Sequence, residues 1–158
     1  MEKVIDIIYI LKSLGLTIVF VGLIGYERQK KNKIAGLTTH LLVAVGASAL
    51  TIVQEIMVLD SIEFIRLYPD LAQNVVIERQ RIIAQIVAGI GFLGTGAIIK
   101  TNGYISGLTT ASTLWIGAII GIVFGLGEYQ LGIIVSVLTL LTLTIVKRIF
   151  WTLLEEHH

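Results

Sequence analysis

Five apolar windows, each close to the length that crosses a lipid bilayer, constrain this chain more than any other feature. A helix needs roughly 20 mainly apolar residues to span the hydrocarbon core of a membrane. The windows run at about Val4–Tyr26, Leu37–Leu59, Ile82–Ile99, Thr109–Gly127 and Tyr129–Val146. We therefore predict an all-α, polytopic membrane protein with five transmembrane helices.

The charged residues are too few to cover a water-soluble surface. They make up 15% of the 158 residues, whereas soluble domains carry about 25%. The 16 glycines against one proline are typical of membrane helices, where glycine permits close packing. No cysteine is present, which excludes thiol chemistry and Cys-based metal sites. No basic domain supports nucleic-acid binding.

Basic residues are divided unequally between the two sides of the predicted membrane domain. One side would hold Arg28, Lys30, Lys31, Lys33, Lys100, Lys147 and Arg148, and the other Lys3, Arg66, Arg79 and Arg81. Because Lys and Arg are enriched in cytoplasmic loops, we predict an N-terminus outside and a C-terminus in the cytoplasm.

A polar segment separates the second and third windows. Residues 60–81 contain the one proline, Pro69, and are predicted to form an external loop, with a short amphipathic helix around Ile62–Tyr68 as one option. We then predict one transmembrane domain over residues 1–154 and a tail over residues 155–158, whose two histidines are typical of an expression tag, with no C-terminal soluble domain.

A repeated four-residue motif indicates that two helical hairpins are duplicated. Gly36-Leu37-Thr38-Thr39 recurs 71 residues later as Gly107-Leu108-Thr109-Thr110. An even number of spans separates the copies, so they would share one orientation as a parallel repeat. We expect the threonine hydroxyls to cap the free N–H groups of the two helices that follow.

Glycine patterns in the third and fourth spans predict close helix packing. Gly89, Gly91 and Gly94 match a dinucleotide-binding fingerprint, but that motif requires a strand–turn–helix unit, and this run lies inside a span. We interpret Gly89, Gly91, Gly94 and Gly96 as a groove for another backbone or a ligand. Packing within the chain and a dimer interface both remain open for Gly117, Gly121 and Gly125.

Ionisable residues within spans are candidates for function because burying them in lipid is costly. An outer polar cluster is predicted, in which Lys12 or Arg81 neutralises Asp6 or Glu55. The alternative is that these groups reach water at helix ends and that Lys12 snorkels. The predicted outer polar cluster is Asp6, Lys12, Glu55, Arg81 and Gln85.

A second group of polar residues is expected at the inner face. Two helix N-termini, hydroxyls, a carboxylate and an arginine could hold a small ion or a phosphate-like anion. Helix capping with a structural Glu27 or Arg28 ion pair is the alternative. The predicted inner polar cluster is Glu27, Arg28, Thr38, Thr39, His40, Thr109 and Thr110. Which residues would hold a metal is left open, no cofactor is predicted, and no nucleophile with a base is evident, so no enzyme is expected.

Four motifs together resemble the MgtC/SapB family of bacterial inner-membrane proteins, over roughly Ile10–Gly127. They are Gly22-Leu23-Ile24-Gly25-Tyr26-Glu27-Arg28-Gln29, Ala35-Gly36-Leu37-Thr38-Thr39-His40, the run Arg81–Gly96, and the run Gly107–Trp115. Lys12 also matches a position that is commonly basic in the family. The sequence departs from the family at Thr38, where an arginine is frequent, which removes any anion or ion-pair role of that arginine.

The resemblance implies five spans and a role in low-magnesium growth, virulence, acid stress and phosphate balance. It also implies an interaction with a membrane protein such as the F-type ATP synthase. We therefore expect a homodimeric protein of the bacterial inner membrane that modulates magnesium and energy homeostasis through other membrane proteins. Two other hypotheses are a small Mg²⁺ or H⁺ transporter or channel and a purely structural scaffold.

Overall fold

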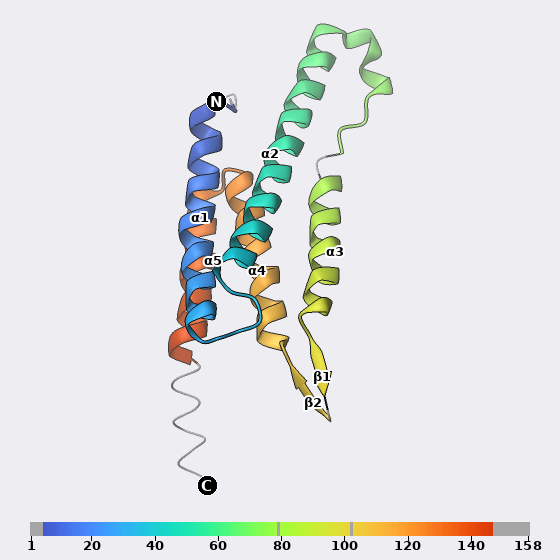
Figure 1. The fold of residues 1–158 in the computed structure, drawn as a ribbon. Helices are drawn as coiled ribbons and strands as arrows, with labels where there is room; N and C mark the ends of the chain where they lie inside the picture. Colours follow the sequence, from blue (N-terminus) through green and yellow to red (C-terminus); the bar gives the residue numbers. More distant parts are fainter. Residues whose placement is uncertain (1–4, 79, 102, 147–158) are drawn as a thin grey trace.

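A computed structural model describes residues 5–78, 80–101 and 103–146 as an up-and-down helical bundle (Figure 1). The predicted tail of residues 155–158 lies outside these ranges, as do Lys3, Arg79, Lys147 and Arg148 of the charge count. The helices are α1 (Ile7–Lys30), α2 (Leu37–Leu67), α3 (Arg81–Gly96), α4 (Leu108–Gly125) and α5 (Tyr129–Leu141). A 3₁₀ helix η1 (Pro69–Asn74), a π-helical turn η2 (Thr142–Val146) and the strands β1 (Ile99–Thr101) and β2 (Tyr104–Ser106) complete the described elements.

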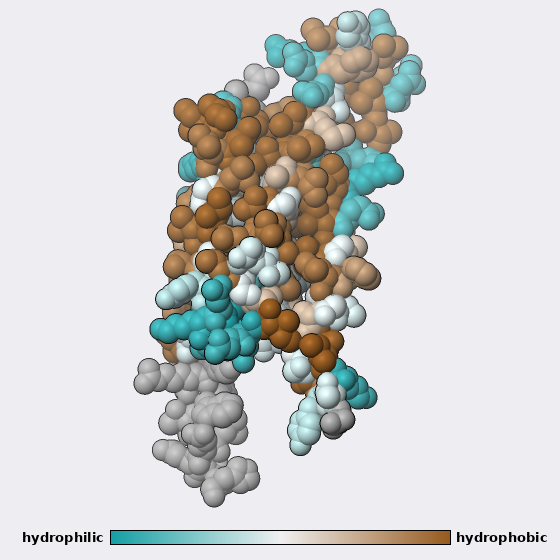
Figure 2. Space-filling model, viewed as in Figure 1, coloured by the Kyte–Doolittle hydropathy of each residue, from teal (hydrophilic) through white to brown (hydrophobic). Residues whose placement is uncertain are grey.

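The described helices form a membrane protein. α1, α2 and α4 are long and apolar enough to cross a bilayer, whereas α3 and α5 are apolar but shorter. Apolar side chains cover the middle of the bundle in Figure 2, and hydrophilic side chains gather at its two ends. A single extended segment in lipid would leave its backbone N–H and C=O groups without hydrogen-bond partners. A helix pairs these groups within the segment, which is why the spans are helical.

α4 lies at the centre of the bundle and packs against α1, α2, α3 and α5. Ile120 and Phe124 of α4 lie in the core, where they pack with Val21 and Ile24 of α1 and Ala44 of α2. The glycines of α4 face inward and allow this approach. A Cβ atom on Gly117 would lie 3.4 Å from Val21 Cγ1, and one on Gly125 would lie 2.7 Å from the Ser48 carbonyl oxygen. The Gly117, Gly121 and Gly125 face thus packs within the chain.

The glycines of α3 behave differently. Gly94 is buried, and a Cβ atom placed on it would lie 3.6 Å from Ala111 Cβ of α4. Gly89, Gly91 and Gly96 have no atom within 4 Å of a Cβ position. Of the groove predicted on α3, Gly94 thus packs against α4, whereas no other described part of the chain fills the space beside Gly89, Gly91 and Gly96.

The second helix extends beyond its predicted end. α2 continues to Leu67, so residues 60–67 prolong the second span, where an external loop with a separate short helix around Ile62–Tyr68 as one option was predicted. These residues include charged side chains but no glycine or proline. Charged side chains indicate where a helix leaves the lipid, but they do not end the helix. The helix ends just before Pro69, which cannot continue it and starts η1 instead.

A short hairpin follows α3 and was not predicted. The third window was expected to reach Ile99, but α3 ends at Gly96 and Ile99 begins β1. β1 pairs with β2 in antiparallel register, with Thr101 opposite Tyr104. The Asn102-Gly103 dipeptide of the sequence, flanked by β-branched and aromatic residues, is a strong hairpin signal.

Candidate functional site

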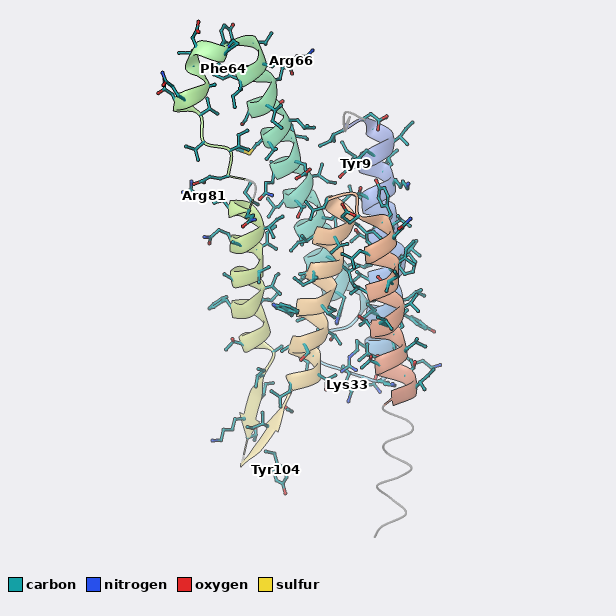
Figure 3. All side chains as sticks on the ribbon, turned by 180° about the vertical axis from the view of Figure 1, so that it is seen from behind. Tyr9, Lys33, Phe64, Arg66, Arg81 and Tyr104 are labelled. Carbon is teal, nitrogen blue, oxygen red and sulfur yellow. The ribbon has the colours of Figure 1, made fainter. Side chains whose placement is uncertain are left out.

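The polar residues of the bundle gather at two ends. We call the end with the C-terminal turn of α1 and the first turns of α2 and α4 the Arg28 end; it is the lower end in Figure 1. The opposite end, with the first turns of α1 and α3, is called the Arg81 end. Figure 3 shows Lys33 and Tyr104 toward the first end, and Arg66, Phe64 and Tyr9 toward the second.

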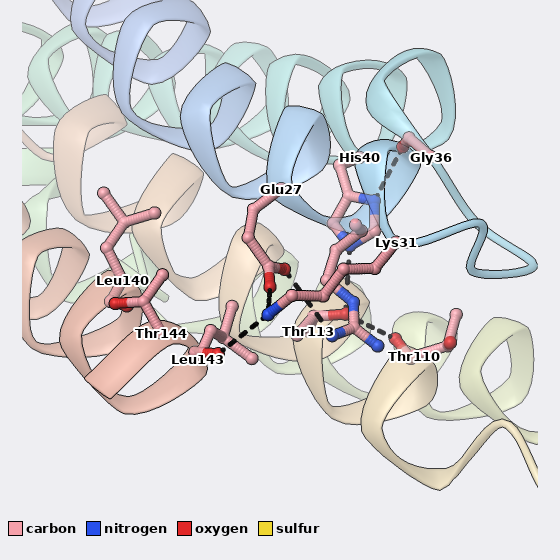
Figure 4. A network of polar contacts seen from close by, with 10 residues as sticks. Glu27, Lys31, Gly36, His40, Thr110, Thr113, Leu140, Leu143 and Thr144 are labelled. Carbon is pink, nitrogen blue, oxygen red and sulfur yellow. Dashed lines mark hydrogen bonds and ion pairs between the residues drawn. The ribbon is translucent and has the colours of Figure 1, made fainter. Parts of the chain in front are cut away.

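His40 connects α2 to α4 at the Arg28 end (Figure 4). Its ring is 1% exposed, and its Nδ1 donates to the Gly36 carbonyl oxygen at 2.8 Å. Its Nε2 lies 3.0 Å from the hydroxyl of Thr113, which also lies 2.9 Å from the Thr110 carbonyl oxygen. Thr113 is one of the hydroxyl residues at the start of the fourth span but was not included in the predicted inner polar cluster. Its spacing of three from Thr110 places both on one helix face, and this spacing is the signal that could have identified it.

Glu27 and Arg28 lie beside this network on α1. Arg28 is 1% exposed, and its Nη1 is 3.6 Å from Glu27 Oε2. Glu27 also pairs with Lys31 one turn later, and Lys31 Nζ donates to the Leu143 carbonyl oxygen at 3.3 Å (Figure 4). The Nε of Arg28 is buried and has no hydrogen-bond partner among the described residues. The carboxylate is therefore shared by two cations, while part of the guanidinium is left unsatisfied.

The predicted threonine caps are wrong. Neither α2 nor α4 has a side-chain cap at its N-cap residue, and Thr38, Thr39 and Thr109 are exposed. At α2 the cap comes from another helix, because the Leu37 N–H donates to Gln29 Oε1 at 3.1 Å. Sequence reasoning missed Gln29 because the two residues are eight apart and meet only after the chain turns. Of the predicted inner polar cluster, Glu27, Arg28, His40 and Thr110 lie in the interior of this end.

At the Arg81 end, Asp6, Lys12 and Arg81 have partners other than those of the expected ion pairs. Asp6 caps α1 by accepting from the Tyr9 N–H at 2.8 Å. Lys12 Nζ lies 3.9 Å from the centroid of the Tyr129 ring, a cation–π geometry. Arg81 pairs with Glu78 at 2.8 Å, and both are exposed. Proximity in sequence explains the last pair, since the two residues are three apart.

The remaining outer residues lie on α2 and α3. Glu55 is half-buried on α2, and Gln85 is exposed on α3. Gln54, 2% exposed, accepts from the Ile83 N–H at 3.1 Å and so caps the first turn of α3. A pocket of about 210 Å³ lies here, and Gln54, Glu78 and Arg81 are among its lining residues. Among the residues that the structure describes, no three His, Asp or Glu side chains are grouped to hold a metal ion.

Comparison with known proteins points to one family. A model of the MgtC family matches residues 14–150. The protein named "Putative magnesium transporter YhiD" of Escherichia coli (strain K12) is 39% identical over 137 residues, which are 87% of this chain and 60% of that protein. The protein MgtC of Brucella abortus (strain 2308) is 42% identical over 106 residues, 67% of this chain and 38% of that protein.

A third relative extends the same likeness. The protein MgtC of Salmonella typhimurium is 37% identical over 139 residues, 88% of this chain and 52% of that protein. The chain thus spans 60% or less of the length of these three relatives. No solved structure matches the chain.

Proposed function

The chain belongs to the MgtC family, and from this premise we propose that it modulates magnesium and energy homeostasis by binding another membrane protein. The proposal includes five membrane spans, with α3 and α5 crossing beside the three longer helices. At about 1.5 Å per residue, the 16 residues of α3 extend about 24 Å. That length is close to the roughly 30 Å hydrocarbon core, and modest thinning of the bilayer accommodates the difference.

The exposed face of α3 carries this proposal. Phe92 is 85% exposed, and the neighbouring Gly89, Gly91 and Gly96 have open space beside them. Small residues let a second helix approach closely in lipid, where apolar burial gives little drive for association. We propose that a helix of another membrane protein occupies this face, such as one from the F-type ATP synthase implied by the resemblance. A second copy of this chain, as in the expected homodimer, is the competing occupant.

The test compares two open glycines on different helices. Gly89 on α3 and Gly46 on α2 are both exposed with no atom within 4 Å. Gly89→Leu should fold but lose complementation of growth at low Mg²⁺ in a strain lacking the gene, whereas Gly46→Leu should retain it. Equal growth with both variants would contradict a binding role of α3. Because the chain contains no cysteine, a photocrosslinker on Phe92→Cys then identifies the occupant by mass, with Ile134→Cys on α5 as the control.

An ion transporter is the second candidate function. The name of the Escherichia coli relative favours it, as does the pocket beside Gln54, Glu78 and Arg81. Purified protein in liposomes should show no Mg²⁺ or H⁺ flux if the chain acts through a partner. Flux that disappears with Glu55→Gln or Arg81→Ala, and persists with the exposed Glu63→Gln on α2, would favour transport instead.

The proposed orientation places the N-terminus outside and the Arg28 end in the cytoplasm of a bacterial inner membrane. The concentration of basic residues at that end supports it. Lys33→Cys and Asp70→Cys report on opposite ends of the bundle in a chain without cysteine. In intact spheroplasts, a membrane-impermeant maleimide should label Asp70→Cys and leave Lys33→Cys unlabelled until the membrane is opened. The reverse pattern would invert the orientation.

A further inference from the structure

A pocket of about 240 Å³ opens between the end of α1 and the start of α4 at the Arg28 end. A water molecule takes up about 30 Å³ of liquid volume, so the space exceeds what one water requires. The lining combines two basic residues, two threonines, a glycine and two apolar residues, and it contains no carboxylate. The lining residues are Arg28, Lys33, Ile105, Gly107, Leu108, Thr109 and Thr110.

The first turn of α4 brings backbone donors to this pocket. Gly107 is the N-cap with φ 88°, and no side chain caps the helix. The first intrahelical bond runs from the Ala111 N–H to the Gly107 carbonyl oxygen at 2.8 Å, so the N–H groups of residues 108–110 precede any intrahelical acceptor. These groups carry the positive end of the helix dipole. The first turn of α2 differs, because Gln29 caps it.

The buried and incompletely hydrogen-bonded side chain of Arg28 is a second, independent indication of a ligand. Its side chain lines the pocket although it is 1% exposed, and its Nε has no hydrogen-bond partner among the described residues. Leaving a donor of a charged group unsatisfied costs more than making the bond contributes, so a buried guanidinium of this kind favours an acceptor. The carboxylate that pairs with Arg28, that of Glu27, is 3.6 Å from Nη1 and is shared with Lys31.

We propose that this pocket binds a phosphate group through Arg28, Lys33 and the free N–H groups of α4. Arg28 and Lys31 share the Glu27 carboxylate, and Lys33 adds a further positive charge to the pocket lining, so the local charge favours an anion. A tetrahedral oxyanion accepts several hydrogen bonds at once, which matches a guanidinium opposite a helix N-terminus. Phosphate can come from inorganic phosphate in water or from a phosphomonoester lipid headgroup, because the pocket lies at one end of the apolar bundle. The site does not depend on the partner proposed for α3.

The experiment measures phosphate binding to the full chain in nanodiscs of phosphatidylcholine. Inorganic phosphate is titrated into the nanodiscs in a calorimeter. Its binding should saturate, and sulfate should compete with it. Lys33→Gln, an exposed position, and Arg28→Gln should each weaken binding about tenfold or more, the scale of one charge-assisted hydrogen bond. Lys30→Gln, which removes the same charge from an exposed residue of α1 outside the pocket, should stay within about twofold.

A second arm distinguishes the source of the phosphate. Nanodiscs with a small fraction of phosphatidic acid should give a ³¹P signal from protein-bound headgroups if lipid is the ligand, and this signal should diminish in Lys33→Gln and persist in Lys30→Gln. Inorganic phosphate binding without that signal assigns the site to the aqueous ion. The proposal is overturned if neither probe binds saturably, or if Lys30→Gln weakens binding as much as Lys33→Gln. Because Lys33 is exposed, its variant keeps the test valid even if Arg28→Gln does not fold.

Discussion

Gly121 of α4 contacts the backbone of Ala44 in α2, and a Cβ atom on Gly121 would overlap the Ala44 carbonyl oxygen. The two helix backbones meet here without a side chain between them. Backbone cannot move aside as a flexible side chain can, so this contact fixes the distance between α2 and α4. It is the kind of small-residue approach on which membrane helices depend.

Gly121→Ala should destabilise the protein by about 1–3 kcal/mol, the usual cost of overpacking. Gly46→Ala is the matched control, because Gly46 lies in a helix with open space around it. That change should alter stability by less than about 1 kcal/mol and in the stabilising direction. Unfolding in mixed micelles with increasing dodecyl sulfate, followed by circular dichroism, measures both. Equal stability of the two variants would mean that α2 and α4 do not approach this closely.

Gln29→Ala should destabilise the protein by about 0.5–2 kcal/mol, because the Leu37 N–H loses its cap. Thr38→Ala and Thr39→Ala should have no comparable effect, since both threonines are exposed and neither caps α2. The same micelle titration compares the three variants. A larger loss with either threonine than with Gln29 would restore the threonine cap that the sequence predicted.

Thr113→Val should cost about 1–3 kcal/mol, because the buried Nε2 of His40 loses its hydroxyl partner. Valine keeps the shape of threonine, so the change removes the hydrogen bond with little effect on packing. Thr109→Val on the exposed side of the same helix turn is the control and should be close to neutral. In the ¹⁵N spectrum of labelled protein, the His40 ring signals should shift in Thr113→Val alone. Unchanged signals would contradict the contact.

Gly107→Ala should be more damaging than Gly103→Ala, although both glycines have positive φ, 88° and 84°. At Gly103 the space is open, so the cost is the left-handed backbone, about 1–2 kcal/mol. At Gly107 a Cβ atom would also overlap the Ala97 carbonyl oxygen, which adds the cost of overpacking, about 1–3 kcal/mol. Thermal unfolding in detergent should rank the variants in this order. The opposite ranking would contradict the close approach of the hairpin to the end of α3.

Helix existence could be predicted from the sequence, but helix ends and contacts could not. Apolar windows specify where lipid surrounds the chain, and so they placed the helices that became α1, α2 and α4. The last turns of α2 around Glu63 and Arg66 were assigned to an external loop, with a separate short helix as one option, because charge and loop coincide in many membrane proteins. Pro69, which cannot continue a helix, is the residue of this segment whose own chemistry accounts for the end of α2.

The sequence predicted several residues of the candidate site but not the contacts that they make. Glu27, Arg28, His40 and Thr110 were selected because they are polar residues at span ends, and they lie together in the structure. Gln29 caps α2, and Lys33 lines the pocket beside α4. Both placements depend on how the loop after α1 turns back toward α2 and α4. No periodicity records that turn, so their partners could be found only in three dimensions.

The central position of α4 has a consequence for the order of synthesis. α1, α2 and α3 are made before α4, yet each of them packs against it. Until α4 has left the ribosome, the Thr51 side chain on α2, which is buried in the finished bundle, lacks its neighbour Gly125. A chain that stops before α4 contains the surfaces of the bundle without the helix that joins them. The packing of α1, α2 and α3 is thus completed only when α4, in the C-terminal half of the chain, has been made.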